Sequence, residues 1–225
     1  MKKSLVALAT LSLIGCAFAE ESKETNWYDV SSGYGSYEYS YKEKQNVTNG
    51  EVHAVQTVTL GARLQHGWSV EIVDETEKVD YQSSTTAQSM EGLTQFGIGK
   101  SFKIQENNFL DNFTPYVKFA YGHKFKSPID FPIFRYDLGT NYKVTDSFGV
   151  QWNWRHRQAY EDTIQTATST STATKYKTNE QAIGLIYKFT PKDSIRLAKK
   201  IERADASGNL SSEYNTTSLT YSRSF

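Results

Sequence analysis

The stretch FGVQWNWRHR, residues 148–157, changes chemical character at every second residue. Its apolar members are Phe148, Val150, Trp152 and Trp154, and the residues between them are Gly149, Gln151, Asn153, Arg155 and Arg157. A period of two is that of a β-strand, because successive side chains of a strand point to opposite faces of its sheet. The stretch therefore predicts a strand with one apolar face and one polar face.

The same alternation recurs along the chain, for example in VTLGARL at 58–64 and IGLIYKF at 183–189. Ten strands are predicted, at residues 26–42, 52–64, 68–78, 91–104, 115–125, 132–144, 147–159, 177–189, 194–203 and 213–225. Tight links, such as 65–67, alternate with longer polar links, such as the Ser/Thr-rich 160–176, and the first and last links are both long. This order predicts an antiparallel up-and-down sheet with the tight turns and both termini at one end and the long loops at the other.

The first 19 residues read as a bacterial secretory signal. Two lysines precede an apolar stretch, and the triplet Ala17-Phe18-Ala19 is a cleavage site of the usual kind. We expect residues 1–19 to be removed and residues 20–225 to form the mature domain. The alternative is a lipobox at LIGC, residues 13–16, which would make Cys16 a lipidated first residue.

Composition limits the function classes. The 25 Lys and Arg residues equal the 25 Asp and Glu residues, so bulk charge does not favour a nucleic-acid partner. Cys16 is the one cysteine, so the exported chain has no disulfide framework. The mean hydropathy of −0.59 is that of a soluble protein, and no apolar run after the signal is long enough for a spanning helix.

The two faces of the predicted strands differ in side-chain size, which separates a membrane barrel from a soluble sandwich. The apolar faces are crowded with Trp, Tyr and Phe, whereas the polar faces carry Gly61, Gly97, Gly99, Gly122, Gly139 and Gly184. A narrow interior requires small residues, and a lipid boundary accepts large ones. The pattern predicts a closed transmembrane β-barrel of ten strands, with twelve as the alternative, in the bacterial outer membrane. Girdle aromatics at the bilayer interfaces are expected at Trp68, Phe148, Trp154 and Phe189.

The last residues, TSLTYSRSF at 217–225, place Leu219, Tyr221 and Phe225 on one face. This ending resembles the C-terminal strand of bacterial outer-membrane barrels, whose terminal aromatic residue is recognised during assembly. The resemblance implies the barrel-assembly machinery and outer-membrane lipid as partners. Arg223 departs from the usual pattern, in which an apolar residue stands at that position.

The polar faces assign eleven cations and seven carboxylates to the lumen. Lys118, Lys124, Arg135, Arg155 and Arg157 lie on three successive predicted strands, whose spacing of about 4.8 Å predicts a basic strip along one wall. Arginine suits bidentate contacts with carboxylate or phosphate groups, so the strip favours small anions. The alternative is that these arginines pair with Asp137, Glu180 and other acids and plug the lumen.

PYVKFAYG at 115–122 and YKVTDSFGVQWNWRHRQAY at 142–160 resemble the strand blocks of the oligogalacturonate-specific porin family. The resemblance implies a monomeric channel for acidic oligosaccharides, with Arg135, Arg155 and Arg157 as its basic track. That family has twelve strands, whereas ten are counted here.

We therefore predict a monomeric outer-membrane channel for passive diffusion of small solutes, with a weak preference for anions or acidic oligosaccharides. The alternative function is a closed barrel that acts through its extracellular loops as an adhesin or a structural protein of the envelope. The four histidines lack a Ser or carboxylate partner by spacing, so we expect no catalytic residues, no metal and no cofactor, and the protein is not predicted to be an enzyme.

Overall fold

The computed structural model describes residues 30–45, 51–81, 89–104, 109–126, 129–160, 176–206 and 210–225. These form ten strands: β1 (Val30–Lys44), β2 (Glu51–Leu64), β3 (Trp68–Tyr81), β4 (Ser89–Ser101), β5 (Phe113–Lys126), β6 (Ile129–Lys143), β7 (Phe148–Ala159), β8 (Lys177–Lys188), β9 (Asp193–Ala206) and β10 (Leu210–Ser224). Two short 3₁₀ turns, η1 (Gln65–Gly67) and η2 (Phe109–Asn112), precede β3 and β5. No helix in these ranges is long and apolar enough to cross a membrane.

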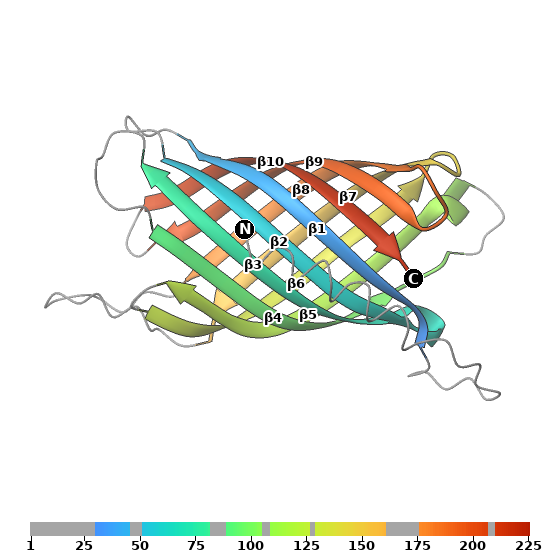
Figure 1. The fold of residues 1–225 in the computed structure, drawn as a ribbon, viewed down its shortest axis with the longest axis horizontal. Coiled ribbons are helices and arrows are strands. Elements are labelled where there is room, and N and C mark those ends of the chain that lie inside the picture. Colours follow the sequence, from blue (N-terminus) through green and yellow to red (C-terminus); the bar gives the residue numbers. More distant parts are fainter. Residues whose placement is uncertain are drawn as a thin grey trace, which may run out of the picture.

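The strands form one closed antiparallel barrel in which each strand pairs with its neighbours in sequence and β1 pairs with β10 (Figure 1). Closure comes with a stagger. Following the directly paired residues from Ser32 on β1 through all ten strands returns to β1 at Lys44, twelve residues further on. A stagger of this kind tilts the strands relative to the barrel axis, as Figure 1 shows. The ten-strand prediction is confirmed, and the twelve-strand alternative does not fit the described barrel.

The two faces of the wall have the predicted chemistry. Large apolar side chains such as Tyr37, Leu185 and Leu219 are exposed on the outside. Arg135, Asp137 and other polar side chains are buried inside. Because lipid offers no hydrogen bonds, the closed ladder is required to satisfy the backbone of every strand.

The tight turns lie at the end of the barrel where β10 ends. In the β2–β3 turn, His66 and Gly67 have positive φ of 56° and 80°, a conformation that glycine adopts without steric cost. Between β6 and β7, Lys143 Nζ lies 2.5 Å from Asp146 Oδ1, and this hydrogen bond holds the pKa of Asp146 below its ordinary value. We refer to this as the turn end, and to the opposite end as the loop end.

Several predicted loops are shorter than expected. The predicted link of 126–131 shrinks to residues 127–128, and that of 204–212 to residues 207–209. The strands continue because backbone pairing persists after the outward side chains become polar. The predicted signal at residues 1–19, the start of the mature domain at residue 20 and the lipobox at Cys16 lie outside the described residues.

A charged substitution tests which face of each strand contacts lipid. Leu219→Arg places a guanidinium on an outward position near mid-strand, and we expect it to lower the free energy of unfolding by about 2–4 kcal/mol. Asn215→Arg, an outward position nearer the loop end of the same strand, should cost only about 0–1 kcal/mol. Urea unfolding in lipid vesicles measures both, and equal costs would contradict the assigned lipid face.

Candidate functional site: a charged lumen

The lumen is lined by ionisable side chains that the register brings together. The ring of paired residues described above passes through Lys118, Asp137, Arg155 and Glu180 on four successive strands. Directly opposite residues on one face of an antiparallel pair lie about 4.5–5.5 Å apart at their Cβ atoms. The alternation of sign along this row therefore places each cation next to a carboxylate.

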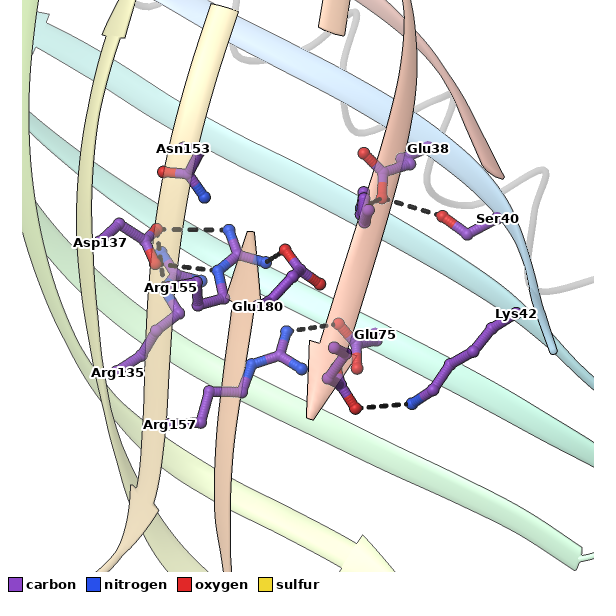
Figure 2. Close-up of polar contacts among 12 residues, drawn as sticks. Glu38, Ser40, Lys42, Glu75, Arg135, Asp137, Asn153, Arg155, Arg157 and Glu180 are labelled. Carbon is purple, nitrogen blue, oxygen red and sulfur yellow. Dashed lines mark hydrogen bonds and ion pairs between the residues drawn. The ribbon is translucent and has the colours of Figure 1, made fainter. Parts of the chain in front are cut away.

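A network of five residues crosses the middle of the lumen, and we call it the waist network: Glu71, Arg135, Asp137, Arg155 and Glu180. Figure 2 shows the last four. Arg135 Nη2 lies 2.5 Å from Glu71 Oε1, and Arg135 Nε lies 3.3 Å from Asp137 Oδ2. Arg155 Nε donates to Asp137 Oδ1 at 2.8 Å, and its Nη1 lies 3.8 Å from Glu180. Arg135 and Asp137 are almost fully buried. Their charges are tolerable inside the protein because each has an ionic partner.

A second cluster lies within four residues of the loop ends of its strands, and we call it the mouth cluster: Lys42, His53, Glu77, Glu91, Lys124 and Glu202. Glu77 is its centre, because its carboxylate lies 2.5 Å from His53 Nδ1, 3.3 Å from Lys42 Nζ and 3.7 Å from Lys124 Nζ. Lys42 also contacts Glu202 at 2.9 Å, and Lys124 contacts Glu91 at 2.9 Å. Lys42 therefore joins β1 to β3 and β9.

Apolar and cationic groups complete the filling of the loop half. Leu93, Phe131, Ile133 and Ala159 form a buried cluster on which Tyr176 packs. Lys124 Nζ lies 5.0 Å from the centroid of the Tyr176 ring. Between this layer and the waist network, Arg157 Nη2 donates to Glu75 Oε2 at 2.9 Å (Figure 2). The loop half of the lumen is thus packed with paired charges and apolar side chains.

The turn half of the lumen differs in what it exposes. Lys118 pairs with Glu71 and Arg155 with Asp137; the cations are 29% and 22% exposed, the carboxylates 4% and 3%. Arg196, which pairs with Glu38 at 2.5 Å, is likewise more exposed than its partner. Lys200 also pairs with Glu38, so β9 reaches β1 past the intervening β10. In the pairs of Lys118, Arg155 and Arg196 the cation is therefore more accessible than its carboxylate.

The structure brings the five residues of the predicted basic strip into the lumen, each beside a carboxylate. Lys118, Arg135 and Arg155 belong to or contact the waist network, Arg157 contacts Glu75, and Lys124 belongs to the mouth cluster. They form parts of a mixed network and not a row of cations alone.

The described ion pairs of the lumen use cations and carboxylates in equal number, and the predicted excess of cations over the whole lumen stays a prediction. Nine Lys and Arg residues face nine carboxylates there: Lys42, Lys44, Lys118, Lys124, Arg135, Arg155, Arg157, Arg196 and Lys200 against Glu38, Glu51, Glu71, Glu75, Glu77, Glu91, Asp137, Glu180 and Glu202. Sequence reasoning missed Lys42, Glu77 and Glu91, although Glu77 follows Glu75 by two residues and so shares its face. The signal that identifies these lumen residues is their spacing of two along a strand, because alternate residues share one face.

The girdle and assembly residues lie on the outer face. Trp68 and Phe148 begin strands at the turn end, and Phe189 follows β8 there. Trp154 lies in the middle of β7, stacked on His156 with ring centroids 6.0 Å apart. Leu219 and Tyr221 lie on the lipid-facing side of β10, and Phe225 follows the last residue of that strand. The Phe225 amide donates a hydrogen bond to Gly33 O at 3.0 Å. Their roles as girdle and assembly signal stay predictions.

The prediction that the histidines lack carboxylate partners is wrong for His53 and His123, because the partners come from adjacent strands or from two residues away on the same face. His123 and His156 lie on the outer face, as their parity predicts, and His53 is buried between Glu51 and Glu77. Within the part of the chain that the structure describes, no group of three or more His, Cys, Asp or Glu residues is placed to hold a metal ion.

A closed antiparallel barrel with an apolar outer face and a charged lumen is a transmembrane β-barrel. The chain belongs to the family described as outer membrane protein beta-barrel domain, whose model matches residues 5–189. It resides in the bacterial outer membrane, as predicted.

Solved structures match this chain at low sequence identity. An outer membrane channel from Pseudomonas putida F1 is 11% identical with a TM-score of 0.51, covering 91% of this chain and 100% of that chain. The NanC porin is 14% identical with a TM-score of 0.45, covering 82% and 98%. The KdgM porin in complex with disordered oligogalacturonate is 13% identical with a TM-score of 0.41, covering 84% and 99%. No curated protein matches the chain.

Proposed function

We propose that this barrel is an outer-membrane channel for passive diffusion of small solutes with a preference for anions, and that the mouth cluster closes it in the described conformation. The observation that carries the proposal is that three lumen cations, Lys118, Arg155 and Arg196, are more exposed than the carboxylates with which they pair. Exposed cations lower the electrostatic energy of an anion that enters, and fixed charges on a pore wall set its selectivity.

The resemblance to oligogalacturonate porins suggests acidic oligosaccharides as one class of solute. The charge pattern itself supports small carboxylates equally well. If the mouth cluster closes the lumen, passage depends on movement of side chains such as Lys42, Lys124 and Tyr176, so we expect brief openings of low conductance.

A second candidate is a closed barrel that acts through its loop end. The packing of the loop half favours it, because Arg157, Lys124 and Glu77 are buried and paired there. A barrel with these pairs intact at all times would be a rigid support for extracellular loops, with no transport.

Single-channel recording in planar bilayers distinguishes the two functions. We expect brief steps whose reversal potential in a potassium chloride gradient indicates chloride preference. Lys118→Gln together with Arg196→Gln should move the reversal potential toward potassium, because both exposed cations lose their charge. Lys199→Gln, which removes an exposed cation from the outer face of β9, is the control and should leave selectivity unchanged.

The outcomes separate cleanly. Complete absence of steps from properly folded barrel would contradict the channel and support the closed barrel. Steps with unaltered selectivity in the double variant would leave a channel but refute the role of the turn-half cations.

A further inference from the structure

The outer face of the barrel is chemically uneven around its circumference. On β5, the outward positions from Phe113 to Phe125 carry no Asp, Glu, Lys or Arg, and Phe125 is the next-to-last residue of the strand. On β9, the outward row already contains exposed Lys199 seven residues before the strand ends at Ala206. The apolar surface therefore reaches the loop end on β5 and stops well short of it on β9.

A chain of aromatic side chains marks the tall sector, and we call it the aromatic face: Phe119, Tyr121, His123, Phe125, Phe134 and Tyr160. Phe134 contacts Phe119, Tyr121 and Tyr160 with ring centroids 5.7, 5.2 and 5.6 Å apart. His123 links Tyr121 to Phe125 at 6.1 and 6.4 Å. Phe125 is 45% exposed and Tyr160 is 62% exposed, so both present apolar surface at the loop end.

The opposite wall is polar at the corresponding height. Arg203 on β9 is 70% exposed and pairs with Glu213 on β10 at 3.0 Å. Lys199 Nζ donates to Thr217 Oγ1 at 3.1 Å, also on the outside. In the ring of ten strands, β10 lies five places from β5, so the polar wall faces away from the aromatic face.

The lengths of the two apolar surfaces differ enough to matter for the bilayer. The twelve residue steps from Phe113 to Phe125 rise about 30 Å along the axis at the usual strand rise and tilt. An outer-membrane barrel normally has an apolar band about 25 Å tall. The β5 surface therefore exceeds the ordinary band, whereas the β9 surface ends below it.

We propose that the acyl chains of the outer leaflet cover the aromatic face up to the loop end of β5, so that the barrel axis is tilted and the lipid boundary runs higher on β4–β6 than on β8–β10. Lipid is the occupant because the aromatic face continues the lipid-facing surface of Val117 and Leu138 below it. The one acidic residue described beside it, exposed Asp130 opposite Phe125, contacts His123 Nδ1 at 3.2 Å. Interfacial aromatic and basic anchors set the tilt of membrane proteins. Lys199 and Arg203 lie across the barrel from the aromatic face. The proposal is independent of whether the lumen conducts.

Spin labels on single cysteines test this boundary. Cys16→Ser removes the only native cysteine, and Phe134→Cys and Asn215→Cys then place labels on outward positions, each five residues from the loop end of its strand. Phe125→Cys and Glu213→Cys form a second pair nearer that end. In bilayer vesicles, collision rates with dissolved oxygen, which partitions into lipid, and with a water-soluble nickel chelate report the surroundings of each label.

We expect the ratio of oxygen to nickel collisions to be several-fold higher at residues 134 and 125 than at residues 215 and 213. Equal ratios within each pair would overturn the proposal, because the boundary would then be level. Low collision rates with both reagents at residues 134 and 125 would also overturn it, since another protein surface, such as a second copy, would then cover the aromatic face.

Discussion

Arg135→Ala is expected to lower the free energy of unfolding by about 3–5 kcal/mol, the usual cost of removing one partner from a buried ion pair. Arg135 is 2% exposed and contacts Glu71 and Asp137. Its removal leaves these carboxylates with fewer cationic partners in a site from which water is largely excluded. Equilibrium urea unfolding of the barrel in lipid vesicles, followed by tryptophan fluorescence, measures the loss.

Two comparisons isolate the electrostatic cause. Arg203→Ala removes an exposed outer ion pair with Glu213 and should cost no more than about 1 kcal/mol. The double replacement Arg135→Met and Glu71→Gln removes one cation and one carboxylate and leaves Asp137 paired with Arg155, so it should cost less than Arg135→Ala alone. If the double variant is the less stable of the two, unpaired carboxylates are not what makes Arg135 important.

The second large effect is expected in conductance. Lys124→Ser and Glu91→Ser remove a cation and its carboxylate partner from the mouth cluster, and Tyr176→Ala removes the ring above Lys124. Net charge is unchanged while the loop half of the lumen loses three large side chains. We expect openings that last longer and a single-channel conductance several-fold above that of the parent barrel.

The control for this experiment is a neutral pair removed elsewhere. Lys143→Ser with Asp146→Ser deletes the exposed ion pair of the β6–β7 turn and should leave conductance unchanged. A triple variant that folds, inserts and conducts no better than the parent would show that the mouth cluster does not close the path.

The sequence predicted the wall of this barrel better than its interior. Whether a side chain faces lipid or lumen depends only on its odd or even position along the strand. The two-residue period therefore placed Trp152 outside and Arg155 inside correctly. The strand count followed from the same period. Strand ends were placed less well, because outward polar residues near the loop end look like loop although their backbone remains paired.

Which charged side chains meet in the lumen depends on the stagger between strands. No local sequence pattern predicts that stagger. Arg135 and Arg155 were correctly expected on neighbouring strands, but Glu71, which meets Arg135, lies 64 residues away on β3. The predicted basic strip took account of neighbours along one wall and not of carboxylates that reach across the lumen. Only the register around the whole ring brings these groups together.

The ion pairs between β1 and β9 link closure of the barrel to the pairing of charges in its lumen. Glu38 and Lys42 on β1 bind Arg196, Lys200 and Glu202 on β9, and these partners come within reach only once the edges of β1 and β10 have joined. Before that, the first strand carries charges whose counterparts stand on the far side of an open sheet. Closing the sheet into a cylinder thus also forms the ion pairs that link β1 to β9 across the interior.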